Sequence, residues 1–393
     1  MHLASAGVLW CFLFGNFVIG FGVLMVPGAM NDITHDLDIT VAQAGLLITA
    51  GSVLMCVSAP FFATVLAKRD RRQLLSWVML WYGFAHALCA LMPNYPSILW
   101  VRVLAMVAPA IFTPQAAACI GQLSTPSQRG RAITFVFVGW SIASVVGMPT
   151  AAWMGEVFGW RAVFAMLSCL SVLSAAWTWQ VIPKGLAPPV MSLSAWRQTL
   201  ASQPLMMTIG VTVLSASGQF VLSAYLAPYF KQTLGTPPGE LSLLFVCFGA
   251  FGLIGNIWMS RQIDRMGAAW SVNLCLILMS MSLLLWPLGT QVWLAALILI
   301  PWGLGMFACN SAQQARLIQL EPDLAAGSAA LNTSAIYLGQ AIGSAGGGWL
   351  INQGAMNQLH WYGWIGIVLS LGLSIASERV AKRNHEDGSN SRP

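Results

Sequence analysis

The sequence predicts an all-α membrane protein whose twelve transmembrane helices form two pseudo-symmetric six-helix halves. First, 57 % of its 393 residues are hydrophobic and 8 % are charged, whereas soluble domains are roughly 45–50 % apolar even with Gly counted. Second, twelve apolar segments recur about every 33 residues, each long enough to cross a hydrocarbon core of roughly 30 Å. Third, a shift of 196 residues carries Arg69 onto Arg265, Gly147 onto Gly343 and Trp153 onto Trp349.

Apolar runs define the spans, and polar residues define their ends. We expect spans at 5–30, 41–66, 74–92, 97–121, 131–155, 162–182, 204–230, 240–260, 268–288, 291–315, 325–352 and 359–380. The first is too long for a signal-peptide core of roughly 7–15 residues, so it should remain as a span. The long polar link at 183–203 separates six spans from six. This gives an N-terminal half (1–182), a cytoplasmic linker (183–203), a C-terminal half (204–381) and a disordered polar tail (382–393).

Small residues and prolines interrupt several spans. They are Gly20, Gly22 and Pro27 in the first, Pro109 and Pro114 in the fourth, Gly139, Gly147 and Pro149 in the fifth, and Gly339, Gly343, Gly346, Gly347 and Gly348 in the eleventh. Ordinary close packing of helices explains any one of them. Their concentration in the paired fifth and eleventh spans favours two halves that rock about a central site. We assign helix packing and bending to Gly139, Gly147, Pro149, Gly343 and Gly347.

Basic residues predict the orientation. Four of them, Lys68, Arg69, Arg71 and Arg72, lie in the short loop between the second and third spans, which the positive-inside bias places in the cytoplasm. With both termini inside, 15 of the 18 Lys and Arg residues, Arg316 among them, are cytoplasmic, whereas Arg161, Lys231 and the acidic Asp32, Asp36 and Asp38 lie outside. The net charge of +6 thus reflects topology, and no nucleic-acid partner is expected.

Several function classes lack their characteristic residues. The eight cysteines are scattered through apolar segments without a C-x-x-C pair, which disfavours disulfides and zinc. None of the four lysines lies in a P-loop, so a nucleotide-driven pump is excluded. A membrane enzyme would need paired His or carboxylate groups, and a channel would need repeated filter loops; the sequence shows neither pattern. We therefore expect a secondary transporter that is not an enzyme, has no cofactor or metal, acts as a monomer in the lipid bilayer and carries a small molecule, with protons as a candidate second partner.

Four stretches resemble the major facilitator superfamily, and within it the twelve-span drug:proton antiporter branch that includes sugar and purine-nucleoside efflux transporters. The first is ATVLAKRDRR at 63–72, beside the family pattern G-x-L-a-D-r-x-G-R-R, with Ala67 in place of the acid and Asp70 in place of the second glycine. Asp264 and Gly267 repeat this pattern in the second half. The second stretch is Arg102, without the Gln-Gly that follows it in relatives. The others are Gly147-Met-Pro149 with FGWRAVF at 158–164, and SGQF at 217–220 with Tyr225 and Pro228.

The resemblance implies the major facilitator fold, alternating access, and efflux in exchange for protons, as in bacterial inner-membrane proteins of drug resistance. The alternative is an uncoupled facilitator or an importer of a small metabolite. By the same resemblance, the basic loop and its repeat gate the cytoplasmic side through charges that pair across the halves; these are Arg69, Asp70, Arg71, Arg72, Asp264 and Arg265.

Polar and aromatic side chains within the spans are the candidates for the substrate cavity: Arg102, Gln115, Trp140, Gln219, Tyr225, Trp302, Asn310, Gln313, Asn332 and Tyr337. The alternatives are a snorkelling Arg102 and amides that only bond neighbouring helices. His86 is expected to be a core histidine. Asp32 is the candidate for proton coupling if it faces Arg102, and otherwise is a solvated loop residue. With Arg102 as the one charge within the spans, the cargo should be neutral or weakly charged.

Overall fold

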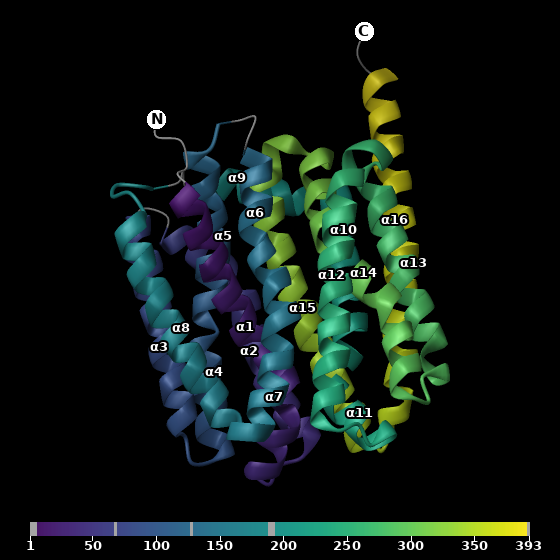
Figure 1. Ribbon diagram of the computed structural model, residues 1–393. Coiled ribbons are helices and arrows are strands. Elements are labelled where there is room, and N and C mark those ends of the chain that lie inside the picture. Colours follow the sequence, from purple (N-terminus) through teal and green to yellow (C-terminus); the bar gives the residue numbers. More distant parts are fainter. Residues whose placement is uncertain (1–5, 67–68, 126–128, 188–192, 391–393) are drawn as a thin grey trace.

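The computed structural model describes residues 6–66, 69–125, 129–187 and 193–390, and this part of the chain folds into helices without strands. Two helical bundles stand side by side, with both termini on one face of the molecule (Figure 1). We call this the terminus face and the opposite one the far face. The predicted all-α architecture is therefore confirmed.

The first bundle contains six spans, two of them broken. Its elements are α1 (Ala6–Asp36), α2 (Val41–Val65), α3 (Arg71–Leu91), α4 (Tyr95–Ala105) with α5 (Val107–Leu123), α6 (Arg129–Ile142) with the π-helical η1 (Ala143–Gly147) and α7 (Met148–Phe158), and α8 (Trp160–Val181). The π-turn lies directly before Pro149, which has no N–H to donate to the preceding turn. The linker carries the short α9 (Leu193–Ala201).

The second bundle repeats this plan. Its elements are α10 (Gln203–Ser223) with α11 (Leu226–Leu234), α12 (Pro238–Met266), α13 (Ala268–Leu285) with η2 (Trp286–Leu288), α14 (Val292–Leu320), η3 (Pro322–Leu324), α15 (Ala325–Asn352), η4 (Met356–Gln358) and α16 (Leu359–Asn390). Eleven helices of the described chain are long and apolar enough to span a membrane. The twelfth, α15, is rich in Gly and Ser and packs against α10 and α2, so it needs less apolar surface than a lipid-facing helix.

Glycines fix the same helix pair in both halves. A β-carbon on Gly139 would lie 2.3 Å from the carbonyl oxygen of Leu13, and one on Gly339 would lie 2.5 Å from that of Val213. A shift of 200 residues therefore relates these contacts, one helical turn more than the 196 that aligns the two charged loops. Close backbone approach is what binds α6 to α1 and α15 to α10.

Two helices run further than expected. We predicted a disordered tail after residue 381, but α16 continues to Asn390, since a formed helix is extended more easily than a new one is nucleated. We also placed Arg316 in a cytoplasmic loop, which is wrong: α14 reaches Leu320, and Arg316 is buried, donating to the hydroxyl of Ser374 over 2.8 Å and to its carbonyl over 3.0 Å. Arg316 is therefore buried, as Arg102 and Arg71 are.

Candidate functional site

Arg102 lies inside the first bundle and is 2 % exposed. Its Nη1 donates to Nε2 of His86 over 2.9 Å, and its Nη2 donates to the carbonyl of Gly22 over 2.5 Å. A guanidinium has only donors, so Nε2 must be the acceptor and the imidazole must be neutral, with its proton on Nδ1. That proton is donated to the carbonyl of Tyr82 over 2.7 Å. Arg102 therefore ties α4 to α1 and α3, and neither snorkels to an interface nor faces the other half.

Of the two alternatives for Asp32, the one that pairs it with Arg102 is wrong. Asp32 accepts the backbone N–H of Trp160 at the start of α8 over 2.5 Å, and Asp36 accepts the indole N–H of Trp160 and pairs with Arg161. Both carboxylates thus stabilise the N-terminus of α8. Arg102 contacts α1 at Gly22, ten residues before Asp32, or about 15 Å away along a helix.

Asp32 instead lines a cavity of about 190 Å³ at the far face. His35 and Glu156 of the first half and Lys231 of α11 in the second half also line it. The cavity therefore brings titratable groups of both halves together, which the sequence did not indicate because these residues are far apart along the chain.

Gln313 and Asn332, each 1 % exposed, belong to a polar cluster inside the second bundle. Gln313 donates to the carbonyl of Thr208 over 2.9 Å and to the hydroxyl of Thr212 over 3.1 Å. That hydroxyl donates to Asn332 over 2.6 Å, and Asn332 donates to Gln314 over 3.2 Å. These bonds join α10, α14 and α15, so the two amides hold helices together, as the packing alternative expected.

The remaining amides divide into two kinds. Gln219 donates to the hydroxyl of Ser215 over 2.9 Å, one turn earlier on the same helix. Gln115 on α5 and the half-buried Asn310 on α14 have no hydrogen-bond partner within the described residues. Gln115 and Asn310 are therefore the predicted amides that remain available to a ligand.

The aromatic candidates also separate. Trp302 is fully buried, with its ring 5.7 Å from that of Phe248 and 5.8 Å from that of Trp286, all within the second bundle. Trp140 is half-buried against Gly20 of α1. Trp302 therefore belongs to the core of the second half. Trp140 is less deeply buried and packs against α1 of the first half.

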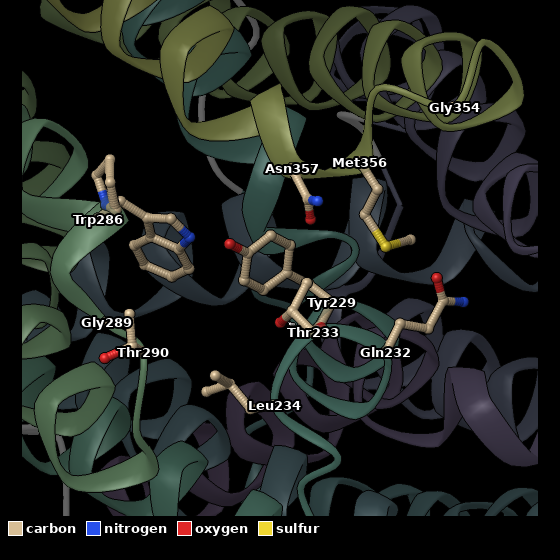
Figure 2. Close-up of a pocket in the computed structure, with 11 residues that line it drawn as sticks. Tyr229, Gln232, Thr233, Leu234, Trp286, Gly289, Thr290, Gly354, Met356 and Asn357 are labelled. Carbon is tan, nitrogen blue, oxygen red and sulfur yellow. Dashed lines mark hydrogen bonds between the residues drawn. The ribbon is translucent and has the colours of Figure 1, made fainter.

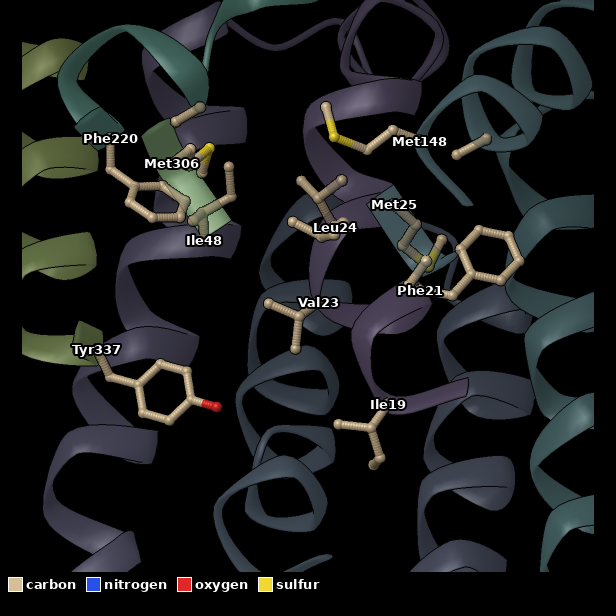
Figure 3. Close-up of a cluster of buried hydrophobic side chains, with 14 of the residues drawn as sticks. Ile19, Phe21, Val23, Leu24, Met25, Ile48, Met148, Phe220, Met306 and Tyr337 are labelled. Atoms are coloured by element: carbon tan, nitrogen blue, oxygen red, sulfur yellow. The ribbon is translucent and has the colours of Figure 1, made fainter. Parts of the chain in front are cut away.

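Side chains of both halves meet in an apolar cluster (Figure 3). Its labelled members include Ile19, Val23 and Leu24 of α1, Ile48 of α2, Phe220 of α10, Met306 of α14 and Tyr337 of α15. We call these seven residues the central cluster. The Tyr337 hydroxyl points from α15 toward α1 and has no hydrogen-bond partner within the described residues (Figure 3). The central cluster thus offers apolar surface and one hydroxyl, without a charged side chain among these seven.

The two halves are in contact from the middle of the bundle to the far face. Thr49 bonds Ser344 over 2.8 Å between α2 and α15, and Asn256 of α12 donates to Ser141 of α6 over 3.3 Å. A β-carbon on Gly249 of α12 would lie 2.6 Å from a backbone atom of the first half, and α11 packs against α1. The far end is therefore closed. Asn256 and Ser141 escaped the sequence analysis because single polar residues in spans have no distinctive spacing.

The basic loop contacts the start of the linker and residues of its own half. Asp70 accepts the backbone N–H groups of Gln73 over 3.1 Å and of Gly185 over 2.5 Å. Arg71 is buried and donates to the carbonyls of Leu66 and Arg69, while Arg72 stacks 4.9 Å from the ring centre of Trp179. In this conformation Arg71 and Arg72 have these partners in the first half. Arg69 and Arg265 are exposed, and the side chain of Asp264 lies outside the described residues.

The carboxylate of Asp70 should hold the linker at neutral pH. Burial raises the pKa of Asp70, but backbone N–H groups of Gly185, Gln73 and Arg72 lower it more, so the net pKa lies below its ordinary value. Such a group stabilises the fold above its unfolded pKa of about 3.9 and loses this effect only as the pH falls through the lower folded pKa. Asp70→Asn should therefore speed tryptic cleavage after Lys184 several-fold. Gln73→Ala is the control, and wild-type cleavage faster at pH 6 than at pH 8 would contradict the assignment.

His86 should matter as the acceptor for a buried cation. His86→Phe leaves Nη1 of Arg102 without that acceptor, which we expect to cost about 2–3 kcal/mol of unfolding free energy. His86→Gln retains an acceptor and should cost less. Thermal unfolding in detergent measures both variants, and equal melting temperatures for His86→Phe and wild type would refute the arrangement.

A separate open hollow lies at the far face of the second bundle and is lined by uncharged residues (Figure 2). Its volume is about 560 Å³, and Trp286, Tyr229, Gln232, Thr290 and Asn357 are among its lining residues. Its lining in the described part of the chain includes none of the predicted site residues. Because its walls come from one half alone, rocking of the halves would not by itself expose it to the other face.

Comparisons with known proteins agree with this architecture. The family model described as Major Facilitator Superfamily matches residues 12–229 and 208–393. The chain is 27 % identical over 340 residues to the "Inner membrane transport protein YdhP" of Escherichia coli K12, covering 86 % of this chain and 87 % of that protein. It is 26 % identical over 345 residues to a "Probable sugar efflux transporter" of Helicobacter pylori, covering 87 % and 86 %.

A solved structure supports the fold independently. It is a bacterial homologue of the human lysosomal transporter Spinster in an inward-facing, unoccupied conformation, with a TM-score of 0.76 and 17 % identity over 96 % of this chain and 97 % of that one. At this identity the likeness concerns the arrangement of the helices and not the cargo.

Proposed function

Because the chain belongs to the major facilitator superfamily, and so is a multi-pass membrane transporter and not an enzyme, we propose that it exports a small, neutral or weakly charged organic molecule in exchange for protons. A drug, a nucleoside or a sugar derivative fits this description. The export direction is supported by the name of one relative, the "Probable sugar efflux transporter" of Helicobacter pylori. The chain would work as a monomer in a bacterial inner membrane, with the terminus face in the cytoplasm.

The composition of the central cluster is the observation that carries the cargo class. Its seven side chains are six apolar groups and the Tyr337 hydroxyl, and the amides of Gln115 and Asn310 are free to pair with hydroxyls or ring nitrogens. A dication would find no carboxylate among these nine residues, and a polyphosphate would find no cation there. The buried arginines support this, since Arg102, Arg316 and Arg71 each donate to partners inside one half.

Alternating access is supported by the closed far end. With the terminus face in the cytoplasm, the closed far end faces outward, and export requires the Thr49–Ser344 contact between the halves to separate. Asp32 stays the proposed proton carrier, now because it lines a far-face cavity together with Lys231 of the other half and not because of Arg102. Opening the far end would part these two groups and change the environment of the carboxylate.

Counterflow in proteoliposomes tests the proposal. Purified protein is loaded with unlabelled nucleoside, sugar derivative or phenicol-like drug, and uptake of the labelled compound is followed with and without a pH gradient. We expect counterflow for at least one neutral compound and accumulation driven by the gradient. Protein-free liposomes are the control. Transport of a dication or a nucleotide would overturn the cargo class, whereas counterflow that ignores the gradient would leave an uncoupled facilitator.

A further inference from the structure

The break between α10 and α11 places Tyr225 where the two halves meet. The break precedes Pro228, which has no N–H for a continuous helix, and Tyr225 itself takes φ −120° and ψ 16°. Its side chain is fully buried, and its hydroxyl donates to the carbonyl of Ser344 in α15 over 2.5 Å. The hydroxyl of Ser344 in turn bonds Thr49 of the first half over 2.8 Å. Tyr225 is therefore part of a polar connection between the halves.

Three glycines form a socket for the ring of Tyr225. A β-carbon on Gly45 would lie 2.0 Å from its hydroxyl oxygen, one on Gly347 2.7 Å from its ring, and one on Gly348 2.8 Å from its hydroxyl oxygen. Real β-carbons do not approach other atoms this closely, so any larger residue at these positions would displace the ring. Gly45 belongs to α2 in the first half, and the other two glycines belong to α15 in the second.

We propose that Tyr225 seated in the socket of Gly45, Gly347 and Gly348 is the latch that holds the far end closed, and that it positions the halves instead of binding cargo. This rests on the proposed alternating access. When the halves rock apart at the far face, Tyr225 keeps its contacts with Gly347 and Gly348 and its bond to Ser344, because these lie in its own half. It must leave Gly45, which lies in the other half.

Of the three socket glycines, Gly45 lies in the other half and separates from Tyr225 when the far end opens. This leads to a specific prediction. The atoms nearest to a β-carbon at Gly45 all belong to Tyr225, so a side chain there prevents closure, and removing the tyrosine ring makes room for it. We therefore expect the effects of Gly45→Ala and Tyr225→Leu to be non-additive, with the double variant closing better than Gly45→Ala alone.

Spin-label distances test the latch on the full-length protein in nanodiscs without cargo. One label pair lies at the far face, on the exposed Val157 and Glu240, and another lies near the terminus face, on the exposed Gln73 and Arg261. Gly45→Ala should raise the ratio of far-open to far-closed molecules about tenfold, and Gly45→Val should raise it more. The double variant Gly45→Ala/Tyr225→Leu should return this ratio toward wild type.

Gly346→Ala is the matched control, because a β-carbon at Gly346 in the same region of α15 meets no atom within 4 Å. Wild-type distances in Gly45→Ala, or a double variant no closer to wild type than the single one, would overturn the latch. If Gly45→Val does not fold, Gly45→Ala and the double variant still decide the question. The measurement uses no cargo, so a failed latch and a failed cargo or coupling assignment give separate results.

Discussion

Replacing Gly139 by valine should prevent stable folding of the first bundle. The new β-carbon would lie 2.3 Å from the carbonyl oxygen of Leu13 and 2.7 Å from the backbone nitrogen of Phe17, and backbone atoms cannot rotate away as a side chain can. We expect a loss of about 3 kcal/mol or more, at or above the usual cost of overpacking. Intrinsic helix propensity alone favours valine over glycine, so the sign of the result shows which effect dominates.

The measurement is thermal unfolding in detergent together with the yield of monodisperse protein. Gly339→Val should behave alike, since Gly339 meets the carbonyl of Val213 in the second bundle as Gly139 meets that of Leu13 in the first. Gly346→Val provides the control at an open position of α15. Equal stability of Gly139→Val and Gly346→Val would show that α1 and α6 do not depend on this close approach.

Truncating Tyr337 should cause the largest loss of transport among variants that still fold. Tyr337→Ala removes both the ring and the hydroxyl that point toward α1 in the central cluster, and we expect export of a neutral cargo to fall about tenfold or more. Tyr337→Phe keeps the ring, so it should lose only the share that depends on one hydrogen bond, a factor of about two to ten.

Leu338→Ala is the control, because Leu338 is the next residue on α15 and is 41 % exposed on its outer surface. Transport is measured by counterflow, and folding is checked by the melting temperature of each variant. Unchanged transport in Tyr337→Ala would remove the central cluster as the cargo site. A drop of equal size in Leu338→Ala would show that transport is sensitive to truncation at any position of α15. The loss in Tyr337→Ala would then not identify the central cluster as the cargo site.

The sequence by itself was enough to predict the membrane class, the helical architecture and the approximate spans. Burial in lipid leaves few options for a backbone, so apolar length alone indicates a helix. The expected eleventh span, 325–352, matches α15 (Ala325–Asn352), and the family resemblance carried by the charged loop and SGQF is confirmed. Glycine positions in the fifth and eleventh spans also indicated close packing, although the repeat that relates them proved to be 200 and not 196 residues.

The partners of individual polar side chains were decided only by the tertiary structure. A hydrogen bond depends on which helix faces which, and one residue of helical rotation turns a side chain by about 100°. Sequence therefore could not show that Arg102 bonds His86, that Asp32 binds the start of α8, or that Gln313 faces Thr208 while its neighbour Gln314 faces Asn332.

The role proposed for Tyr225 likewise depends on which helices face each other, here between the two halves. Its socket combines Gly45 of the first half with Gly347 and Gly348 of the second. These glycines are far apart along the chain and meet at one ring only because the two halves dock. Local patterns determine which segments become helices, because backbone hydrogen bonding in lipid is satisfied within each segment. The docking of those helices is fixed by side-chain shape between segments, and shape complementarity leaves no periodic trace in a single sequence.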